Sequence, residues 1–513
     1  MAAVCCPAVV AAVLMTLVPA LPAVAAGGLS ARSARVPRPA ANVPVTPENL
    51  VDRTASNSPV IAADPRQPRF VVLANRLDGP DFGCALQVSG DRGRSWVSAY
   101  PVPRLPAGAE KCYAPEVAFD GRGRLYFLFL GLHGGGNSPA GAFLTVSSDR
   151  ARTFSPPQQV LGPDRYQVRM AIDPEDGADG RLHLVWLEAT APAPLGGLPP
   201  PPNPLMAAHS DDGGRTFSPP VQVSDPERRL VVAPALATGP HHAVHVLYYD
   251  LGDDRVDYQG LEGPTFGGRW SLVATTSPDG GAHFDHGVTV DDELVPPERV
   301  MLIFTMPPPA LAADQSDRLF AAWDDARNGD WDVFLRSSVD GGRTWDEARR
   351  VNDDALHDGS HQYLPRLAVA SSGRLDIAFY DRRGNPENRG NDVSFASSDD
   401  HARTFSPNVK VTTLDSDSRI GPRYDVPSAA GLNELGSRIG LLSGPSSALV
   451  AWTDTRNTGR AFPAQDIFAA TVKVDESSPK PAWWPRLALA AALFLAAALA
   501  VVLARGRSSA SSR

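Results

Sequence analysis

The chain has 513 residues, of which 43% are hydrophobic and 20% are charged, and its formal net charge is −9. This composition excludes an intrinsically disordered chain and a collagen-like one. The acidic balance argues against a nucleic-acid partner, because binding to a phosphate backbone requires a basic surface.

Residues 1–26 are predicted to be a secretory signal that is cleaved off. They carry no charge, and their apolar run, Ala8 to Val18, is too short to span a bilayer. Small residues from Ala23 to Ala26 fit a cleavage site. No Lys or Arg precedes the apolar run, which departs from the usual pattern, so an uncleaved amphipathic anchor is the alternative. Residues 27–41 follow as an N-terminal extension.

An eight-residue motif then recurs six times. With small variations it reads Ser-x-Asp-x-Gly-x-Thr followed by Trp or Phe, and the copies begin at residues 89, 147, 210, 277, 338 and 398. Near-even spacing of this kind is typical of repeat architectures. The motif predicts a strand–turn–strand in which the Asp carboxylate accepts N–H groups of its own turn and Gly supplies a positive φ. Ala151 and Ala402 replace that Gly, so we expect their turns to differ slightly.

A second repeat, Pro-x-apolar-Ala, lies upstream of the octets and begins an apolar, β-rich stretch. Its seven copies lie at 59–62, 115–118, 168–171, 234–237, 309–312, 365–368 and 427–430. The two repeats together predict an all-β protein, a β-propeller of seven four-stranded blades over residues 42–475. The seventh unit has no octet and no fourth strand. Residues 42–46 resemble a fourth strand, so we predict that they close the last blade.

The C-terminal part is predicted to cross a membrane once. A Pro-rich linker, residues 476–486, precedes an uncharged stretch at 487–504 that is long enough for one transmembrane helix. Trp483 and Trp484 precede this stretch as an interfacial belt would, and arginines flank it. We therefore expect a single-pass protein of the cell membrane, with its ectodomain outside and residues 505–513 as a cytoplasmic tail.

Cys84 and Cys112 are the only cysteines of the expected mature chain. In an oxidising compartment an even pair indicates a disulfide. Two free, buried thiols are the alternative.

The residues that break the second repeat are the candidates for function, because features shared by every blade belong to the scaffold. The position after Pro is small in most copies but is charged at Glu116, Arg169 and Arg366. A second layer of side chains lies two positions before the Pro of each copy, or before the residue that replaces it. This layer and its sequence neighbours add the polar groups of Tyr113, Tyr166, Tyr363, Arg423 and Asp425. We predict a polar, aromatic funnel at the mouth of the central channel. The alternative is that Glu116 and Arg169 pair with each other and plug the channel.

No cofactor is expected. The acidic, Gly-containing stretch from Asp173 to Asp179 is the one candidate for Ca²⁺. It lacks the alternating ligand spacing of a calcium loop, so we expect an exposed turn there and no metal.

The octet resembles the Asp-box, or bacterial neuraminidase repeat, of the sialidase superfamily, and the resemblance covers residues 42–475. It implies a β-propeller, usually of six blades in that superfamily, whereas the count here gives seven. Catalytic members hold a sugar carboxylate with three arginines and use a Tyr–Glu nucleophile and an Asp acid/base. The resemblance makes Tyr363, Glu116 and Asp425 the candidates for chemistry. The candidates for ligand binding are Arg169, Arg366, Arg423, Tyr113 and Tyr166.

Two functions remain open. The superfamily carries its first arginine in a Phe-Arg-Ile-Pro motif, but the corresponding stretch here, Ser56 to Pro59, contains no Arg. This difference favours a cell-surface, sialidase-like propeller that binds a glycan, a cell-envelope polymer or a protein without catalysis. The alternative is an active exo-glycosidase that acts on glycoconjugates.

Overall fold

The computed structural model describes residues 36–46, 55–79, 81–99, 105–135, 137–173, 180–191, 200–254, 266–296, 308–385, 387–418, 420, 435–457 and 465–474. Within these ranges no helix is long and apolar enough to cross a membrane. The expected signal at 1–26 and the expected linker, membrane span and tail at 476–513 lie outside the described residues.

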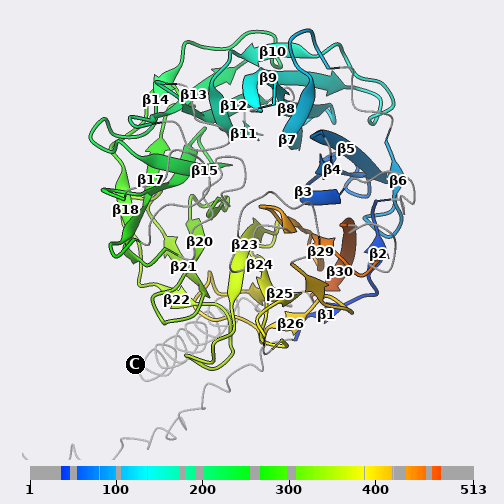
Figure 1. The fold of residues 1–513 in the computed structure, drawn as a ribbon, viewed down its shortest axis with the longest axis vertical. Coiled ribbons are helices and arrows are strands. Elements are labelled where there is room, and N and C mark those ends of the chain that lie inside the picture. Colours follow the sequence, from blue (N-terminus) through cyan, green and yellow to red (C-terminus); the bar gives the residue numbers. More distant parts are fainter. Residues whose placement is uncertain are drawn as a thin grey trace, which may run out of the picture. The chain divides into compact units, whose positions relative to one another are not determined.

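The described strands form seven antiparallel blades in a ring (Figure 1). Blade 1 contains β3 (Ala55–Ala63), β4 (Val71–Asp78), β5 (Gly83–Ser89) and β6 (Val97–Ser98). Blade 2 contains β7 (Lys111–Phe119), β8 (Leu125–His133), β9 (Ser138–Ser147) and β10 (Gln158–Leu161). Blade 3 contains β11 (Arg165–Asp173), β12 (Arg181–Glu188), β13 (Leu205–Ser210) and β14 (Val221–Gln222). Blade 4 contains β15 (Val231–Thr238), β16 (Val244–Asp250), β17 (Trp270–Ser277) and β18 (Val288–Leu294).

The other three blades complete the ring. Blade 5 contains β19 (Ala310–Ala313), β20 (Leu319–Asp325), β21 (Asp332–Ser338) and β22 (Arg349–Arg350). Blade 6 contains β23 (Gln362–Val369), β24 (Leu375–Asp381), β25 (Gly390–Ser398) and β26 (Val409–Lys410), and β27 (Ser416–Asp417) also pairs with β25. Blade 7 contains β28 (Gly440–Ser443), β29 (Ser447–Asp454) and β30 (Asp466–Lys473), with β1 (Arg38–Pro39) and β2 (Val43–Pro44) on its outer edge. The prediction of seven four-stranded blades is confirmed.

The N-terminal strands close the ring as predicted. Val43 pairs with Ala469 of β30, and Arg38 pairs with Lys473. Pairing therefore begins within the stretch assigned to the N-terminal extension, a few residues earlier than the predicted boundary at residue 42. Asn42 strengthens the closure, because its side chain donates to Val411 O at 2.9 Å and accepts from Thr413 N at 2.8 Å.

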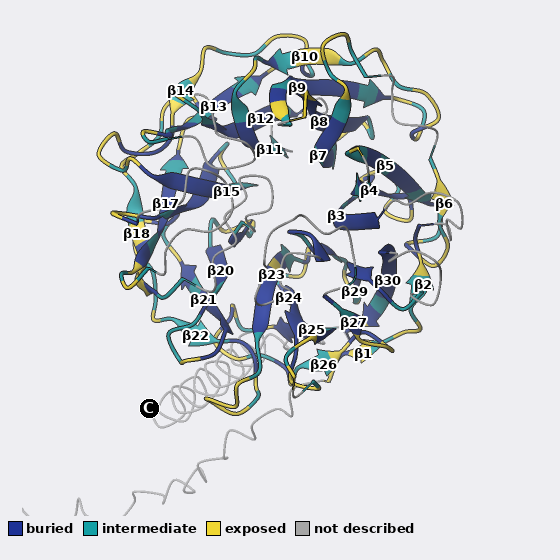
Figure 2. Cartoon of the chain, viewed as in Figure 1, coloured by how far each residue is buried: buried dark blue, intermediate teal, exposed yellow. Residues whose placement is uncertain are grey.

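The blades pack through apolar side chains on both faces of each sheet. The middle strands are almost wholly buried, whereas the turns and the outermost strands carry most of the exposed residues (Figure 2). Trp186, Trp323 and Trp452 lie on the second strands of blades 3, 5 and 7 and are at most 1% exposed. Burial of such large side chains between neighbouring sheets stabilises the ring.

The octets form one recurrent turn. In the copy at residues 147–154, Thr153 donates from its backbone N and from its hydroxyl to Asp149, at 2.9 and 2.6 Å, and Ala151 N donates to Ser147 Oγ at 2.9 Å. The hydrogen bonds from Thr153 and Ser147 lower the pKa of Asp149 to about 2. Ala151 and Ala402 adopt φ of 60° and 65°, whereas the glycines at this position adopt 81° to 91°. The turns at these alanines therefore differ slightly in backbone conformation, as expected, although they stay left-handed and keep the hydrogen bond to the Ser hydroxyl.

The predicted disulfide between Cys84 and Cys112 is present. It joins β5 of blade 1 to β7 of blade 2, and the two cysteines are 28 residues apart in sequence. Closing a loop of this length restricts the unfolded chain and stabilises the protein by about 3–4 kcal/mol.

The innermost strand of blade 7 differs from the prediction. The sequence analysis placed it at residues 427–430, which lie outside the described residues. The structure has β28 at this position, where Gly440 pairs with Ala451 of β29. The Pro-x-apolar-Ala pattern at 427–430 misled the assignment, since β28 has no proline and occupies the inner register without it.

Candidate functional site

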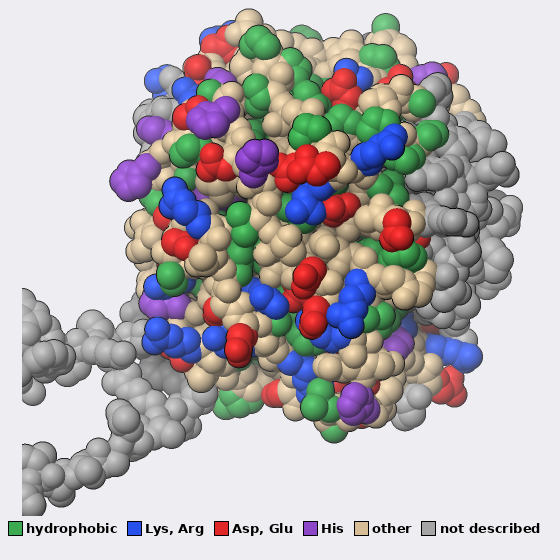
Figure 3. All heavy atoms as spheres, turned by 90° about the vertical axis from the view of Figure 1, so that its left-hand side faces the viewer, with side chains coloured by type: hydrophobic (Ala, Val, Ile, Leu, Met, Phe, Trp, Pro, Cys, Tyr) green, Lys and Arg blue, Asp and Glu red, His purple; other side chains and the backbone are tan. Residues whose placement is uncertain are grey.

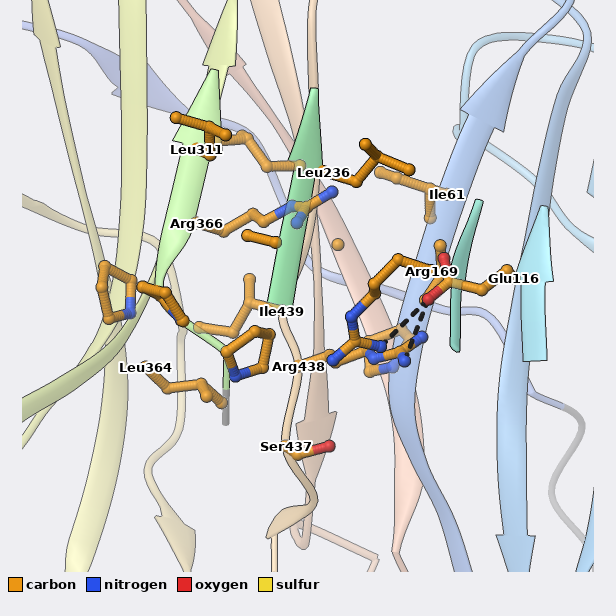
Figure 4. Close-up of a pocket in the computed structure, with 18 of the residues that line it drawn as sticks. Ile61, Glu116, Arg169, Leu236, Leu311, Leu364, Arg366, Ser437, Arg438 and Ile439 are labelled. Carbon is orange, nitrogen blue, oxygen red and sulfur yellow. Dashed lines mark hydrogen bonds and ion pairs between the residues drawn. The ribbon is translucent and has the colours of Figure 1, made fainter. Parts of the chain in front are cut away.

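A central cavity lies where the innermost strands of the blades meet. It encloses about 730 Å³ of space not filled by atoms, including the part that opens to solvent. Its charged lining residues are Glu116 of β7, Arg169 of β11, Arg366 of β23 and Arg438, which precedes β28. Four different blades therefore bring their charges to one place, as Figure 4 shows. The structure thus brings together three side chains that the sequence analysis selected.

A recurrent β-bulge sets the direction of these side chains. The pairing shifts by one residue between Tyr113 and Glu116, between Tyr166 and Arg169, and between Tyr363 and Arg366. The residue within each bulge is left-handed, with φ of 47° to 56° in these three strands. Because a bulge adds one residue to its strand, the simple alternation of faces is broken at that point.

Glu116 lies between two arginines. Its Oε1 is 3.1 Å from Arg169 Nη1 and 3.0 Å from Arg438 Nη2 (Figure 4). Backbone carbonyls fix both guanidinium groups, because Arg169 Nε donates to Pro234 O at 2.9 Å and Arg438 Nη1 donates to Pro115 O at 3.1 Å. The predicted alternative, a Glu116–Arg169 pair, therefore exists, but Arg438 shares it.

Arg366 stands apart from this cluster. Its side chain is exposed to the cavity, and no hydrogen bond or ion pair joins it to another described residue. Protein nevertheless surrounds it, and the resulting loss of hydration lowers the pKa of Arg366 below its usual value, while the charge of Glu116 opposes this effect. Because Arg366 is exposed to the cavity and has no partner among the described residues, its guanidinium is available to bind an anion.

The charges of the cavity do not balance. Three guanidinium groups face one carboxylate, which leaves two positive charges among the described lining residues. Burial raises the pKa of Glu116, whereas Arg438 and Arg366 lower it. On the face drawn in Figure 3, by contrast, basic and acidic side chains are interspersed. The positive charge of the cavity is therefore not an extension of a basic patch on that face.

An outer cavity adjoins the central one and shares Arg169, Arg438 and Ser437 with it. Tyr113 and Arg76 also line it. Arg76 Nη1 donates to the Tyr113 hydroxyl at 2.7 Å, and the same guanidinium binds both oxygens of Asp78 at 2.6 Å. Arg169 and Arg438, the two arginines that bind Glu116, thus line both cavities.

The predicted layer of tyrosines is only partly present at the cavities. Tyr113, Tyr166 and Tyr363 are only 1%, 3% and 6% exposed and pack inside the blades, and of the three only Tyr113 also borders the outer cavity. Tyr363 donates its hydroxyl to Asn391 Oδ1 at 2.7 Å and stacks on Tyr380. The prediction that Tyr166 and Tyr363 line the mouth is wrong, because it assumed an alternation that the bulges interrupt.

Arg423 and Asp425 lie outside the described residues, so their predicted roles stay predictions. The sequence analysis missed Arg438 and Arg76. Arg438 was missed because the last inner strand was placed too early, although the apolar run after it and the following Gly-Pro-Ser turn are typical of a hairpin. Arg76 aligns in register with Leu130, Leu187, Tyr249 and Tyr380. These residues share no type, so the repeat gave no signal for Arg76.

Metal-binding residues do not gather in the part of the chain that the structure describes. No group of three or more His, Cys, Asp or Glu there is placed to hold an ion. Within the stretch proposed for Ca²⁺, Asp173 is buried and lies 2.8 Å from His242 Nδ1, and residues 174–179 lie outside the described ranges.

The fold and the site define a seven-bladed β-propeller with a cationic central cavity. No protein-family model and no curated protein matches the sequence. Among solved structures, a protein of unknown function from Dyadobacter fermentans is 13% identical, with a TM-score of 0.48, over 85% of this chain and 99% of that one. The endosialidase of phage phi92 is 12% identical, with a TM-score of 0.45, over 86% and 70% of the two chains. A PL25 ulvan lyase is 13% identical, with a TM-score of 0.46, over 85% and 96%.

Proposed function

We propose that the protein is a non-catalytic, Asp-box propeller that binds an acidic glycan or an acidic cell-envelope polymer through an anionic group of that ligand. The observation that carries the proposal is the cavity formed by Arg169, Arg366 and Arg438, in which only Glu116 opposes the three positive charges. Guanidinium groups match carboxylates and sulfates in geometry as well as in charge. The Asp-box resemblance of the octets supports a glycan as the source of that anion.

The described tyrosines support binding rather than hydrolysis. A tyrosine nucleophile needs a lowered pKa or a neighbouring base. Burial instead raises the pKa of Tyr113, and also that of Tyr363. Tyr363 is committed to Asn391, and Glu116 is committed to two arginines. Neither Tyr113 nor Tyr363 is therefore activated by a free carboxylate.

The test compares the full-length protein with an Arg366→Gln variant on a panel of sialylated, uronic-acid-containing, sulfated and neutral glycans. We expect the wild type to bind the acidic glycans of the panel and the variant to bind them at least tenfold more weakly. Arg403→Gln is the matched control, since Arg403 is exposed within an octet, and we expect it to bind like the wild type. Equal binding of acidic and neutral glycans, or wild-type binding by Arg366→Gln, contradicts the proposal.

Turnover is measured on the same proteins with a fluorogenic sialoside and a broad set of glycosides. We expect no product above the level of the Arg366→Gln variant. Product formation that is lost in Arg366→Gln but kept in Arg403→Gln favours the exo-glycosidase instead.

We also propose that the propeller is displayed outside the cell and held by the span at 487–504. The apolar stretches at 8–18 and 487–504 support this placement. Protease treatment of intact cells should digest the propeller while an epitope after residue 513 stays protected. Deletion of 487–504 should release the propeller into the medium, whereas retention of the deleted form in the cytoplasm contradicts the proposal.

A further inference from the structure

Each innermost strand carries one position that is charged in some blades and small in others, such as Glu116 or Ala235. The next residue along the strand is aliphatic in all seven blades and pairs with the second strand in the same register each time. The seven residues are Ile61, Val117, Met170, Leu236, Leu311, Leu367 and Leu441. Five of them line the central cavity, namely Ile61, Met170, Leu236, Leu311 and Leu441. We call these five residues the aliphatic collar. Since residues at this position point away from the charged layer, the collar forms a second, apolar layer of the same cavity.

Arg366 lies at the boundary between the two layers. Figure 4 shows it between collar residues Leu311 and Leu236 on one side and the Glu116–Arg169 pair on the other. The cavity therefore offers, in the same lining, aliphatic side chains and a cation that has no partner among the described residues. Met170 and Leu236 are only half-buried in the protein, so a ligand has apolar surface left to cover there.

This arrangement discriminates between anions of equal charge. An oxyanion at Arg366 gains the same ion pair whatever substituent it carries. A substituent that faces the collar gains if it is aliphatic, because it removes apolar surface from water. A hydroxyl there loses its water partners and finds no acceptor on the collar.

We infer that the cavity selects an anion that carries a compact aliphatic group next to its charge, such as a carboxylate with an adjacent methyl or ethyl group. This inference rests on the proposed function, in which Arg366 binds the anionic group of the ligand. It narrows the ligand class from acidic glycans in general to those whose acidic group bears an apolar substituent.

The test titrates the full-length protein with formate, acetate, propionate and butyrate at constant ionic strength, with ligand-observed NMR as the readout. Burial of one methylene contributes about 0.8 kcal/mol, so affinity should rise about fourfold at each step until the collar is filled. Glycolate and propionate form a matched pair, because a hydroxyl replaces a methyl of similar size, and propionate should bind more tightly.

Variants separate the collar from the cation. Leu236→Ala should bind formate like the wild type but show a smaller rise along the series, whereas Arg366→Gln should lose the whole series. If all carboxylates and sulfate bind equally, or if glycolate binds as tightly as propionate, the inference falls while anion binding stands. If no anion binds and Arg366→Gln changes nothing, the proposed function falls with it. Thermal unfolding of both variants shows whether they remain folded.

Discussion

At the residue scale, Glu116 limits the charge of the central cavity. It is the one acidic side chain among the described lining residues, and it accepts from Arg169 and Arg438. Glu116→Gln changes the net charge of the lining from two positive charges to three. We expect this variant to bind small anions about tenfold more tightly, which corresponds to about 1.4 kcal/mol, and to unfold at a lower temperature because the arginines repel one another.

Titration with sulfate at low salt and a thermal melt measure these two effects. Glu387→Gln is the control, because that carboxylate belongs to an exposed pair with Arg389. Weaker anion binding by Glu116→Gln would show instead that Glu116 holds the two arginines in place for the ligand.

A second residue-scale prediction concerns acid stability. His183 is 2% exposed, and its Nε2 has no hydrogen-bond partner. Burial first, and then the neighbouring charges of His209 and Arg181, lower the pKa of His183 to about 3. The unfolded chain, with a pKa of about 6.5, therefore takes up the proton first, and stability is lost as the pH falls from about 6.5 towards 3.

Between pH 7.5 and pH 5 this effect amounts to about 2 kcal/mol. His183→Leu should therefore lose less stability over that interval than the wild type, as measured by urea unfolding at both pH values. His133→Leu is the control, since His133 is exposed at the end of β8, and it should keep the wild-type dependence on pH. Parallel losses in all three proteins would refute the assignment.

At the scale of the element, the octet turn tolerates Ala only where the neighbouring blade leaves room. Gly214 has a φ of 86°, and an added Cβ would lie 2.3 Å from Leu144 Cδ2 of blade 2. We expect Gly214→Ala to lower the free energy of unfolding by about 2–3 kcal/mol, from the left-handed backbone and the displaced leucine. Gly90→Ala, which meets no atom within 4 Å, should change it by less than about 0.5 kcal/mol. Equal effects of the two substitutions in denaturant unfolding would contradict this explanation.

The same elements show what the sequence could predict. Repeats fixed the number of blades, and the charges that interrupt them led to Glu116, Arg169 and Arg366. The tyrosines were misplaced because the bulge was not anticipated. Its left-handed residues share no side-chain property, but four of the five, Ser58, Ala114, Ala233 and Leu364, directly precede the Pro of the Pro-x-apolar-Ala repeat, and the fifth is Gln167. Tertiary hydrogen bonds also stabilise the bulge, as where Leu364 N donates to Asp324 Oδ1 at 3.0 Å.

At the scale of the whole molecule, closure depends on a few contacts between distant parts of the sequence. The Asn42 amide bonds to Val411 and Thr413 beside blade 6 and accepts from Arg456 Nη2 at 3.0 Å beside blade 7. Asn42→Ala leaves these groups without their partner and should lower the free energy of unfolding by about 1–3 kcal/mol. Val36→Ala, at a nearby position that is 55% exposed, is the control. A wild-type melt for Asn42→Ala would show that β-pairing alone closes the ring.

The pairing of β1 and β2 with β30 also orders events during synthesis. The first strands to leave the ribosome must wait for the last strand, more than 420 residues later, before their backbone groups find partners. A nascent chain that stops before residue 466 has no docking edge for its own beginning. Closure of the ring is therefore possible only after the whole propeller has been synthesised.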